Sequence, residues 1–238
     1  MNHVAKSRGF TITELMLAMT FISVLLLAIA MTIIQVATIY NKGMTLKEVN
    51  QSGRSIGDDI RRNISASGSF TLSTNYLTNP AGGRLCVDNY SYLWNYADAI
   101  QSGNPNVVRY ATGGSRSGET IRLVKVPDPS GAYCARSGST FVYATVRASD
   151  QDRASELLQS GDRLLSIHQF ALTTSSAVAD PATGQRLYQL SYTIGTGEVA
   201  ALTTDRSSCL PPGAANANFS YCAVQQFELV IRAGNGVN

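Results

Sequence analysis

One stretch near the N-terminus limits what this chain can fold into more than any other feature. Residues 15–40 read LMLAMTFISVLLLAIAMTIIQVATIY, an uncharged run in which Gln35 is the most polar side chain. A helix of this length measures about 39 Å, whereas the hydrocarbon core of a bilayer is roughly 30 Å thick. We therefore expect one transmembrane helix over residues 15–40, with a membrane as its partner.

A cleavable secretory signal is the alternative interpretation of this segment. Basic residues precede it, and Ala28-Ile29-Ala30 matches an A-x-A cleavage site. However, the apolar run continues for ten residues beyond Ala30. In addition, Glu14 would lie in the first turn of the signal core, where a carboxylate hinders insertion. Both features favour a helix that is retained.

The glutamate at the start of this helix has a local explanation. Thr11 and Glu14 fit the S/T-x-x-E capping box, in which each side chain binds the backbone N–H of the other residue. A carboxylate in the first turn also interacts favourably with the helix dipole. Capping explains why a glutamate is tolerated. Placing an ionisable group in a membrane segment nevertheless costs about 2.5–3.5 kcal/mol. We therefore expect Glu14 to have a partner that offsets this cost.

Residues 8–15, R-G-F-T-I-T-E-L, follow a short basic leader and precede the apolar run. This arrangement resembles the cleavage and methylation signature of type IV prepilins and type II secretion pseudopilins. The resemblance implies that residues 1–9 are a leader peptide and that a prepilin peptidase cuts between Gly9 and Phe10 on the cytoplasmic side. It also implies methylation of the new Phe10 amine. Many pilins have a proline in the membranous half of the helix, but residues 10–44 contain none.

The resemblance further implies a partner for Glu14. Cleavage would expose the α-amine of Phe10, whose ordinary pKa lies near 8, and opposite charges attract more strongly in apolar surroundings than in water. In the family, this glutamate of an incoming subunit meets the first amine of a subunit already in the filament, which sets the axial register. The implied partners are other pilin subunits, the prepilin peptidase and the inner-membrane assembly platform. The implied location is the cytoplasmic (inner) membrane, single-pass, and then a cell-surface or periplasmic filament.

The helical pattern continues beyond the membrane segment. Apolar residues recur at steps of three and four between positions 46 and 64, while charged residues fall mainly on the other faces. We expect one helix over residues 10–64, membranous in its first half and docked on a globular domain in its second. Gly43, Gly53 and Gly57 each cost about 1 kcal/mol in helix propensity, which predicts bends or local fraying.

Residues 65–238 form the expected globular domain. From Gly68 onward, short β-rich runs alternate with Gly, Pro, Asn and Ser. The connections are typical of hairpins, which predicts a mostly antiparallel sheet and an α+β fold with the long helix packed on one sheet face. The expected strands cover residues 84–96, 107–111, 120–126, 140–147, 164–172, 186–194 and 221–231, and a short helix covers residues 150–159.

Aromatic and histidine side chains in this domain favour structural roles. Tyr92, Trp94 and Tyr96 recur at period two, which predicts a row facing the core or the helix; an exposed aromatic binding surface is the alternative. His168 has no sequence neighbour that would make it a general base. We expect it to be buried or half-buried on a strand.

Charge and acidic residues indicate neither a cofactor nor a metal site. The net charge of +3 falls by two, to +1, without Lys6 and Arg8 of the leader, so nucleic-acid binding by bulk charge is not expected. Asp128 and Asp150 begin acidic turns that lack the ligand count of a calcium loop. These turns are expected to be solvated.

Four cysteines, Cys86, Cys134, Cys209 and Cys222, follow the apolar segment. An even count in an exported region suits disulfides better than zinc. A bridge between Cys209 and Cys222 would close a loop similar to the stapled C-terminal loop of many pilins, leaving Cys86 and Cys134 as the second bridge. Four cysteines allow three pairings, and buried free thiols are a further alternative.

The globular part spans 174 residues from 65 to 238, which resembles the larger minor pilins and larger minor pseudopilins. The expected function is structural and non-enzymatic: a minor pilin of a type IV pilus, assembled through its N-terminal helix. A minor pseudopilin of a type II secretion system is the alternative. A single-span anchored enzyme or binding module is less favoured, because the sequence offers no combination of nucleophile, base and orienting residue.

Overall fold

A computed structural model describes residues 11–137, 140–158, 164–175 and 179–234. The chain divides into two compact units, Met1–Asn41 and Lys42–Asn238, which are described separately. Helix α1 (Ile12–Ala66) begins in the first unit and ends in the second. Gly9 and Phe10, the expected cleavage site, lie outside the described residues.

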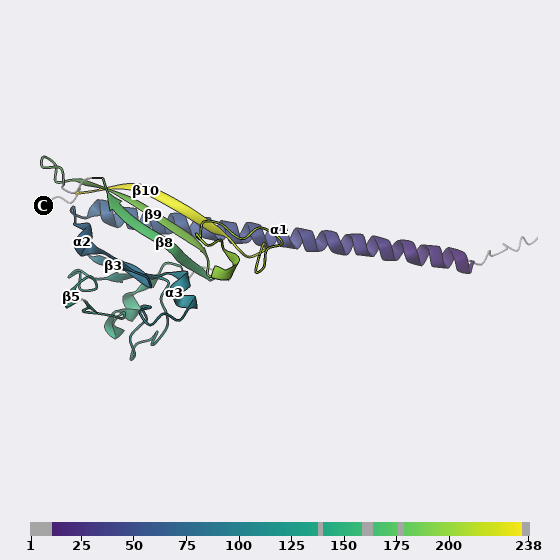
Figure 1. Cartoon of the computed structure of the whole chain (residues 1–238), viewed down its shortest axis with the longest axis horizontal. Helices are drawn as coiled ribbons and strands as arrows, with labels where there is room; N and C mark the ends of the chain where they lie inside the picture. The colour runs from purple at the N-terminus through teal and green to yellow at the C-terminus, as the bar shows by residue number, and fades with distance from the viewer. Residues whose placement is uncertain (1–10, 138–139, 159–163, 176–178, 235–238) are drawn as a thin grey trace, which may run out of the picture. The chain divides into compact units, whose positions relative to one another are not determined.

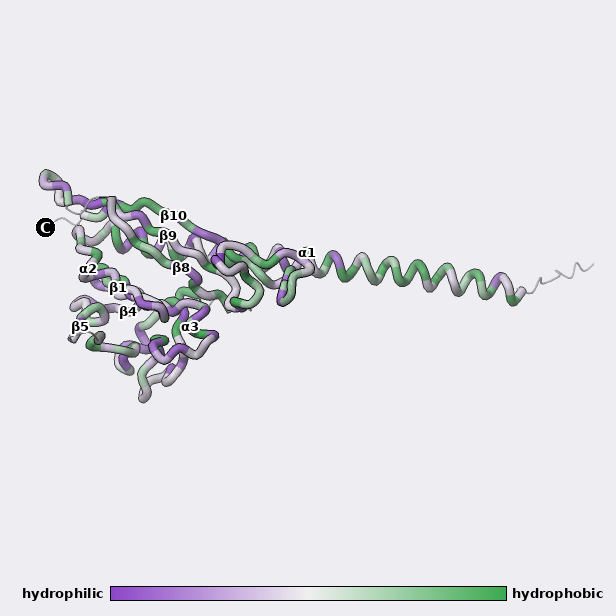
Figure 2. Tube along the Cα trace, viewed as in Figure 1, coloured by the Kyte–Doolittle hydropathy of each residue, from purple (hydrophilic) through white to green (hydrophobic). Residues whose placement is uncertain are grey.

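The described part of the first unit consists almost entirely of α1. Within the described residues, α1 is the one helix that is both long enough and apolar enough to cross a membrane, judged by length and composition. Its most apolar 18-residue window has a mean hydropathy of 2.6. Green, hydrophobic stretches recur along this part of the helix in Figure 2, with paler stretches between them. The part of the chain that the structure describes therefore contains one candidate membrane span, near the N-terminus.

The second unit contains two main sheets (Figure 1). The three-stranded sheet has the order β10-β9-β8, and the five-stranded sheet has the order β1-β2-β3-β4-β7. All pairs of named strands in the described residues are antiparallel, so the expected α+β class is confirmed. The strands are β1 (Tyr76–Asn79), β2 (Gly82–Val87), β3 (Tyr90–Asn95), β4 (Leu123–Pro127), β5 (Arg136–Ser137), β6 (Thr140–Phe141), β7 (Ser155–Glu156), β8 (Leu165–Thr174), β9 (Arg186–Thr196) and β10 (Val224–Ala233).

Short helices connect these strands. Two are α-helical and two are 3₁₀ turns: α2 (Leu72–Asn75), α3 (Ala97–Gln101), η1 (Ala148–Arg153) and η2 (Val199–Ala201). The strands β5 and β6 form a separate two-stranded ribbon.

The second half of α1 packs against both main sheets. Val49, Ile56, Ile60 and Ile64 lie on one helix face and are at most 1% exposed. They belong to a single core cluster with side chains from the two sheets. The helix therefore shares its apolar stripe between two sheets, which corrects the expectation of one sheet face. The sheet residues in this cluster include Leu85, Tyr92, Trp94, Leu190, Tyr192 and Ile194.

Two glycines of α1 mark close contacts with the three-stranded sheet. A Cβ atom on Gly57 would lie 2.5 Å from the Tyr192 hydroxyl oxygen and 2.8 Å from a Leu229 methyl carbon. A Cβ atom on Gly53 would lie 2.1 Å from the Phe227 ring. The helix is unbroken at both positions, so the expected local fraying is wrong. The absence of a side chain lets the helix approach β9 and β10.

The predicted strand over residues 84–96 is instead the β2–β3 hairpin. The chain reverses at Asp88 and Asn89, and Asp88 adopts a positive φ of 49°. Aspartate and asparagine tolerate this conformation better than most residues and favour turns. The sequence therefore contains the turn signal, within the residues predicted to form one strand.

Three further secondary-structure predictions are wrong. Residues 107–111 make only isolated bridges, because the Asn95 side chain takes the place of a strand partner, donating to Val108 O and accepting from Val108 N. Only Thr140–Phe141 of residues 140–147 is a strand. The helix predicted over residues 150–159 is a 3₁₀ turn that ends at Arg153, followed by β7.

The aromatic row of β3 faces the core, as predicted. Tyr92 and Trp94 are fully buried, and Tyr96 is half-buried against the same cluster. The Trp94 ring stacks on Phe170 of β8 with centroids 4.1 Å apart, which joins the two sheets.

Candidate functional site

The first turn of α1 contains the expected capping box. The Thr11 backbone N–H donates to Glu14 Oε2 at 2.9 Å, and the Glu14 backbone N–H donates to Thr11 Oγ1 at 3.3 Å. The Thr11 hydroxyl also donates to Glu14 Oε2 at 2.8 Å. The carboxylate is exposed and bound to its own helix terminus. The geometry confirms the capping prediction, whereas a meeting of Glu14 with Phe10 remains a prediction.

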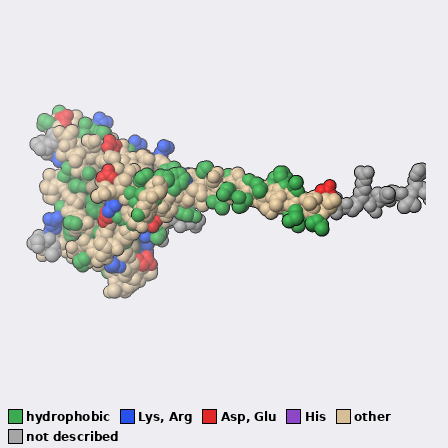
Figure 3. All heavy atoms as spheres, turned by 45° about the vertical axis from the view of Figure 1, so that its right-hand side comes forward, with side chains coloured by type: hydrophobic (Ala, Val, Ile, Leu, Met, Phe, Trp, Pro, Cys, Tyr) green, Lys and Arg blue, Asp and Glu red, His purple; other side chains and the backbone are tan. Residues whose placement is uncertain are grey.

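The surface of α1 in the first unit is apolar and exposed. Large hydrophobic side chains are exposed along this part of the helix, and several are visible on the face shown in Figure 3. Leu17 is 72% exposed and Phe21 is 67% exposed. An apolar surface this extensive requires lipid or other apolar surfaces around it in place of water. Further exposed members include Leu25, Ile33 and Ile39.

Four aliphatic hydroxyl groups lie within residues 15–40, and each bonds inside the helix. They donate to backbone carbonyl oxygens three or four residues earlier, at 2.8 or 2.9 Å. These hydroxyls therefore need no water, which suits the interior of a bilayer. The donors are Thr20, Ser23, Thr32 and Thr38.

Lys42, the first charged residue after Glu14, contacts the C-terminal disulfide loop. Its amine donates to the Cys222 carbonyl oxygen and lies 5.5 Å from the centroid of the Phe219 ring. Partial burial lowers the pKa of the Lys42 amine below its usual range. The sequence gives no sign of this contact, because its partners are 180 residues apart and no local pattern links them.

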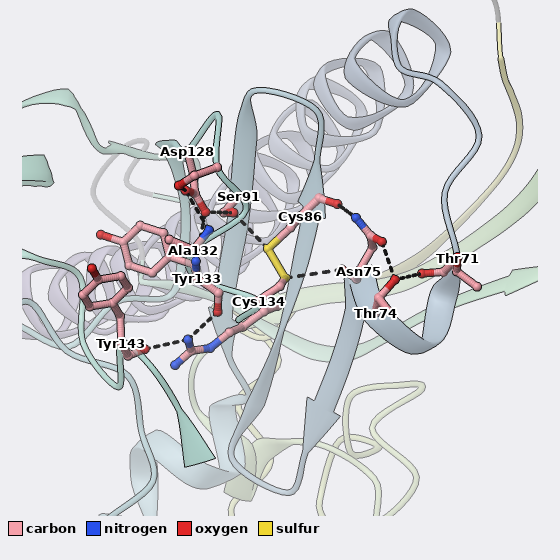
Figure 4. Close-up of a disulfide and its surroundings, with 12 residues drawn as sticks. Thr71, Thr74, Asn75, Cys86, Ser91, Asp128, Ala132, Tyr133, Cys134 and Tyr143 are labelled. Atoms are coloured by element: carbon pink, nitrogen blue, oxygen red, sulfur yellow. Dashed lines mark hydrogen bonds between the residues drawn. A yellow bond between two sulfur atoms is a disulfide. The ribbon is translucent and has the colours of Figure 1, made fainter. Parts of the chain in front are cut away.

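The four cysteines form two disulfides, Cys86–Cys134 and Cys209–Cys222. This is the expected pairing, in which Cys209–Cys222 was suggested by the C-terminal loop of pilins and Cys86–Cys134 was the remaining pair. Cys86–Cys134 joins β2 to the segment before β5 (Figure 4). Cys209–Cys222 closes the loop that leads into β10. Both bridges lie in the second unit.

Asp128 and Asp150 are each 1% exposed, so the prediction of solvated turns is wrong for these two carboxylates, although Ser130 and Asp152 of the same turns are exposed. Asp128 accepts hydrogen bonds from the Ser91 hydroxyl and from the backbone N–H groups of Ala132 and Tyr133, beside the first disulfide (Figure 4). These donors replace water around the carboxylate and shape the turn after β4.

Asp150 is held by charged and hydroxyl partners. It accepts from the Tyr133 hydroxyl at 2.6 Å and forms ion pairs with Arg147 at 2.7 Å and Arg153 at 3.0 Å. Burial alone would raise the pKa of Asp150, but these three partners outweigh burial and lower it. The arrangement fixes the 3₁₀ turn η1 and leaves no free carboxylate oxygen for a metal.

His168 is 5% exposed on β8, in agreement with the prediction of a strand histidine. Its Nε2 lies 3.1 Å from the Thr196 carbonyl oxygen, which can only accept, so Nε2 carries the proton. Nδ1 is buried without a hydrogen-bond partner among the described residues. Burial lowers the pKa of His168. A neutral imidazole enclosed in this way serves the fold.

No group of three or more histidine, cysteine, aspartate or glutamate side chains in the described ranges is arranged to hold a metal ion. Searches against protein-family models, curated proteins and solved structures find no match. A long N-terminal apolar helix followed by a β-sheet domain is a pilin-like architecture. The candidate site is therefore the surface of α1 in the first unit, with Glu14 at its start.

Proposed function

We propose that the chain is a minor pilin: a structural subunit of a type IV pilus, cut by a prepilin peptidase between Gly9 and Phe10 and assembled through α1. One observation carries the proposal. The exposed surface of α1 between Leu15 and Tyr40 is apolar, and a single carboxylate, Glu14, lies at its start. A helix of this kind can reside in lipid and can also pack among copies of similar helices.

The proposed assembly step exchanges one apolar environment for another. Lipid and neighbouring helices are equally apolar, so the hydrophobic effect gives little preference between them. The attraction between Glu14 of one subunit and the Phe10 amine of another would supply the preference, because water is excluded from both environments. The Thr11–Glu14 capping box supports this role by holding the carboxylate at the helix terminus.

The direct test is incorporation of a Glu14→Ala variant into filaments. We expect membrane insertion and leader cleavage to continue while the amount of the variant in sheared filaments falls at least about tenfold, which corresponds to roughly 1.4 kcal/mol. Gln35→Leu is the matched control, since it also removes a polar side chain from the same helix surface. Normal incorporation of Glu14→Ala would refute the register role.

A minor pseudopilin of a type II secretion system would use the same helix and the same carboxylate. The phenotype of a deletion strain distinguishes a pilin from a pseudopilin. Deletion of a pilin should abolish surface filaments and leave the set of secreted proteins unchanged. Deletion of a pseudopilin should reduce secretion and spare the surface filaments.

A further inference from the structure

The C-terminal disulfide loop has an uncharged surface next to Lys42, the residue of α1 with which the second unit begins. Residues 207–227 contain no charged side chain. Phe219 is 48% exposed and Tyr221 is 50% exposed, and the two prolines of the loop, Pro211 and Pro212, are exposed as well. The Cys209–Cys222 bridge and the bond from Lys42 to the Cys222 carbonyl hold the loop beside α1.

Distances along α1 place Lys42 near the outer boundary of a bilayer. From Glu14 to Lys42 the helix rises about 42 Å, and a bilayer with its headgroups is about 40–45 Å thick. With Glu14 at one boundary, Lys42 reaches the headgroups of the opposite leaflet. The Phe219 ring lies 5.5 Å from the Lys42 amine, so it reaches the same level.

The chemistry of the loop matches that of the headgroup region. Tyrosine and tryptophan concentrate at this level of a membrane because an aromatic ring with a polar group suits both neighbouring phases. Uncharged side chains avoid the cost of removing a charge from water. Lys42 adds a cation, which anionic headgroups attract.

We propose that the Cys209–Cys222 loop contacts the membrane, with Phe219 and Tyr221 in the headgroup region while the subunit resides in the bilayer. The contact would give the second unit a second attachment to the membrane besides α1. It would have to break when the subunit enters a filament. This inference rests on membrane insertion of α1, which is part of the proposed function, but it does not depend on the filament type.

Tryptophan fluorescence in the full-length protein tests the contact. The chain has one tryptophan, Trp94, which is fully buried and supplies a constant background. Phe219→Trp places a reporter in the loop, and Tyr221→Trp is a second reporter there. Val142→Trp is the negative control, because Val142 has the same 48% exposure as Phe219 but lies beside β6. Phe21→Trp is the positive control within α1.

Each variant is reconstituted in vesicles of phosphatidylglycerol and a phosphatidylcholine brominated close to the headgroup end of its acyl chains. We expect strong loss of the added emission for Phe219→Trp, Tyr221→Trp and Phe21→Trp, and little loss for Val142→Trp. If Phe21→Trp is quenched but both loop reporters behave like Val142→Trp, the loop contact is refuted while insertion of α1 stands. If Phe21→Trp is not quenched, membrane insertion and the loop contact both fail. Loop reporters that become shielded only in assembled filaments would assign the loop to a subunit interface and overturn the inference.

Discussion

Asp59 joins α1 to the five-stranded sheet through two charge-assisted hydrogen bonds. Its carboxylate accepts from the Tyr92 hydroxyl at 2.7 Å and from the Lys125 amine at 2.9 Å. Burial, together with the bond to Asp59, raises the pKa of Tyr92 well above its usual range. The raised pKa favours the protonated Tyr92 hydroxyl, which is the form that donates to Asp59.

Sequence separation decides which residue contacts could be predicted. The Thr11–Glu14 capping box was predictable because its partners are three residues apart. The partners of Asp59 are 33 and 66 residues away, and no spacing rule connects them. The burial of Asp128 and Asp150 is unpredictable for a related reason: a carboxylate in a turn is exposed unless the fold brings donors to it.

We expect His168 to make the free energy of unfolding depend on pH. Burial lowers its folded pKa below the ordinary value of 6.5; its bond to Thr196 and the charge of Asp98 oppose this shift, and Arg206 adds to it. As pH falls through 6.5, the unfolded chain binds a proton that the folded protein still excludes. The free energy of unfolding should therefore decrease from about that pH down to the lower folded pKa.

Chemical denaturation of the full chain and of His168→Gln, above and below this pH, measures the effect. The variant should be less stable at neutral pH but should lose less stability on acidification than the parent. Equal pH dependence in the two proteins would contradict the assignment of a neutral, buried His168.

At the scale of elements, the length of α1 can be predicted from the sequence, but the residues through which it contacts the sheets cannot. Its length follows from an apolar run and then an apolar stripe at helical spacing. Propensity, however, treats every glycine of the helix alike, whereas Gly57 faces Tyr192 and Gly43 has no heavy atom near its missing Cβ. Only the positions of β9 and β10 show that Gly57 lies at a close helix–sheet contact and that Gly43 does not.

Alanine substitutions at these two glycines should have opposite effects. Gly57→Ala inserts a methyl group against the Tyr192 hydroxyl and Leu229 and should lower the free energy of unfolding by about 1–3 kcal/mol. Gly43→Ala meets no neighbour and should raise it by up to about 1 kcal/mol through helix propensity. Thermal or denaturant unfolding of both variants provides the comparison, and a stabilising Gly57→Ala would disprove close helix–sheet contact at this position.

At the scale of the whole molecule, the fold class was predictable and the division of strands was not. Alternating runs separated by turn residues predict antiparallel pairing. They do not reveal that β8, β9 and β10 form a sheet of their own, since this depends on the shared core around Trp94, Phe170 and the stripe of α1. The two disulfides lie at separate places in this unit and constrain loops of different length.

The two disulfides should contribute unequally to stability. The Cys86–Cys134 bridge spans 48 residues and the Cys209–Cys222 bridge spans 13. Restriction of the unfolded chain then predicts a loss of about 4 kcal/mol for the Cys86→Ser, Cys134→Ser pair of substitutions and about 3 kcal/mol for the Cys209→Ser, Cys222→Ser pair. Denaturation of both double variants tests this order, and a more stable Cys86, Cys134 variant would reverse it.

The central claim is that α1 functions with a free, processed N-terminus at Phe10. Mass analysis of the N-terminal peptide of the protein extracted from its native membrane tests this most directly. We expect a peptide that begins at Phe10 and carries one added methyl group. A peptide that begins at Met1, or a mature chain that begins beyond Ala30, would contradict it.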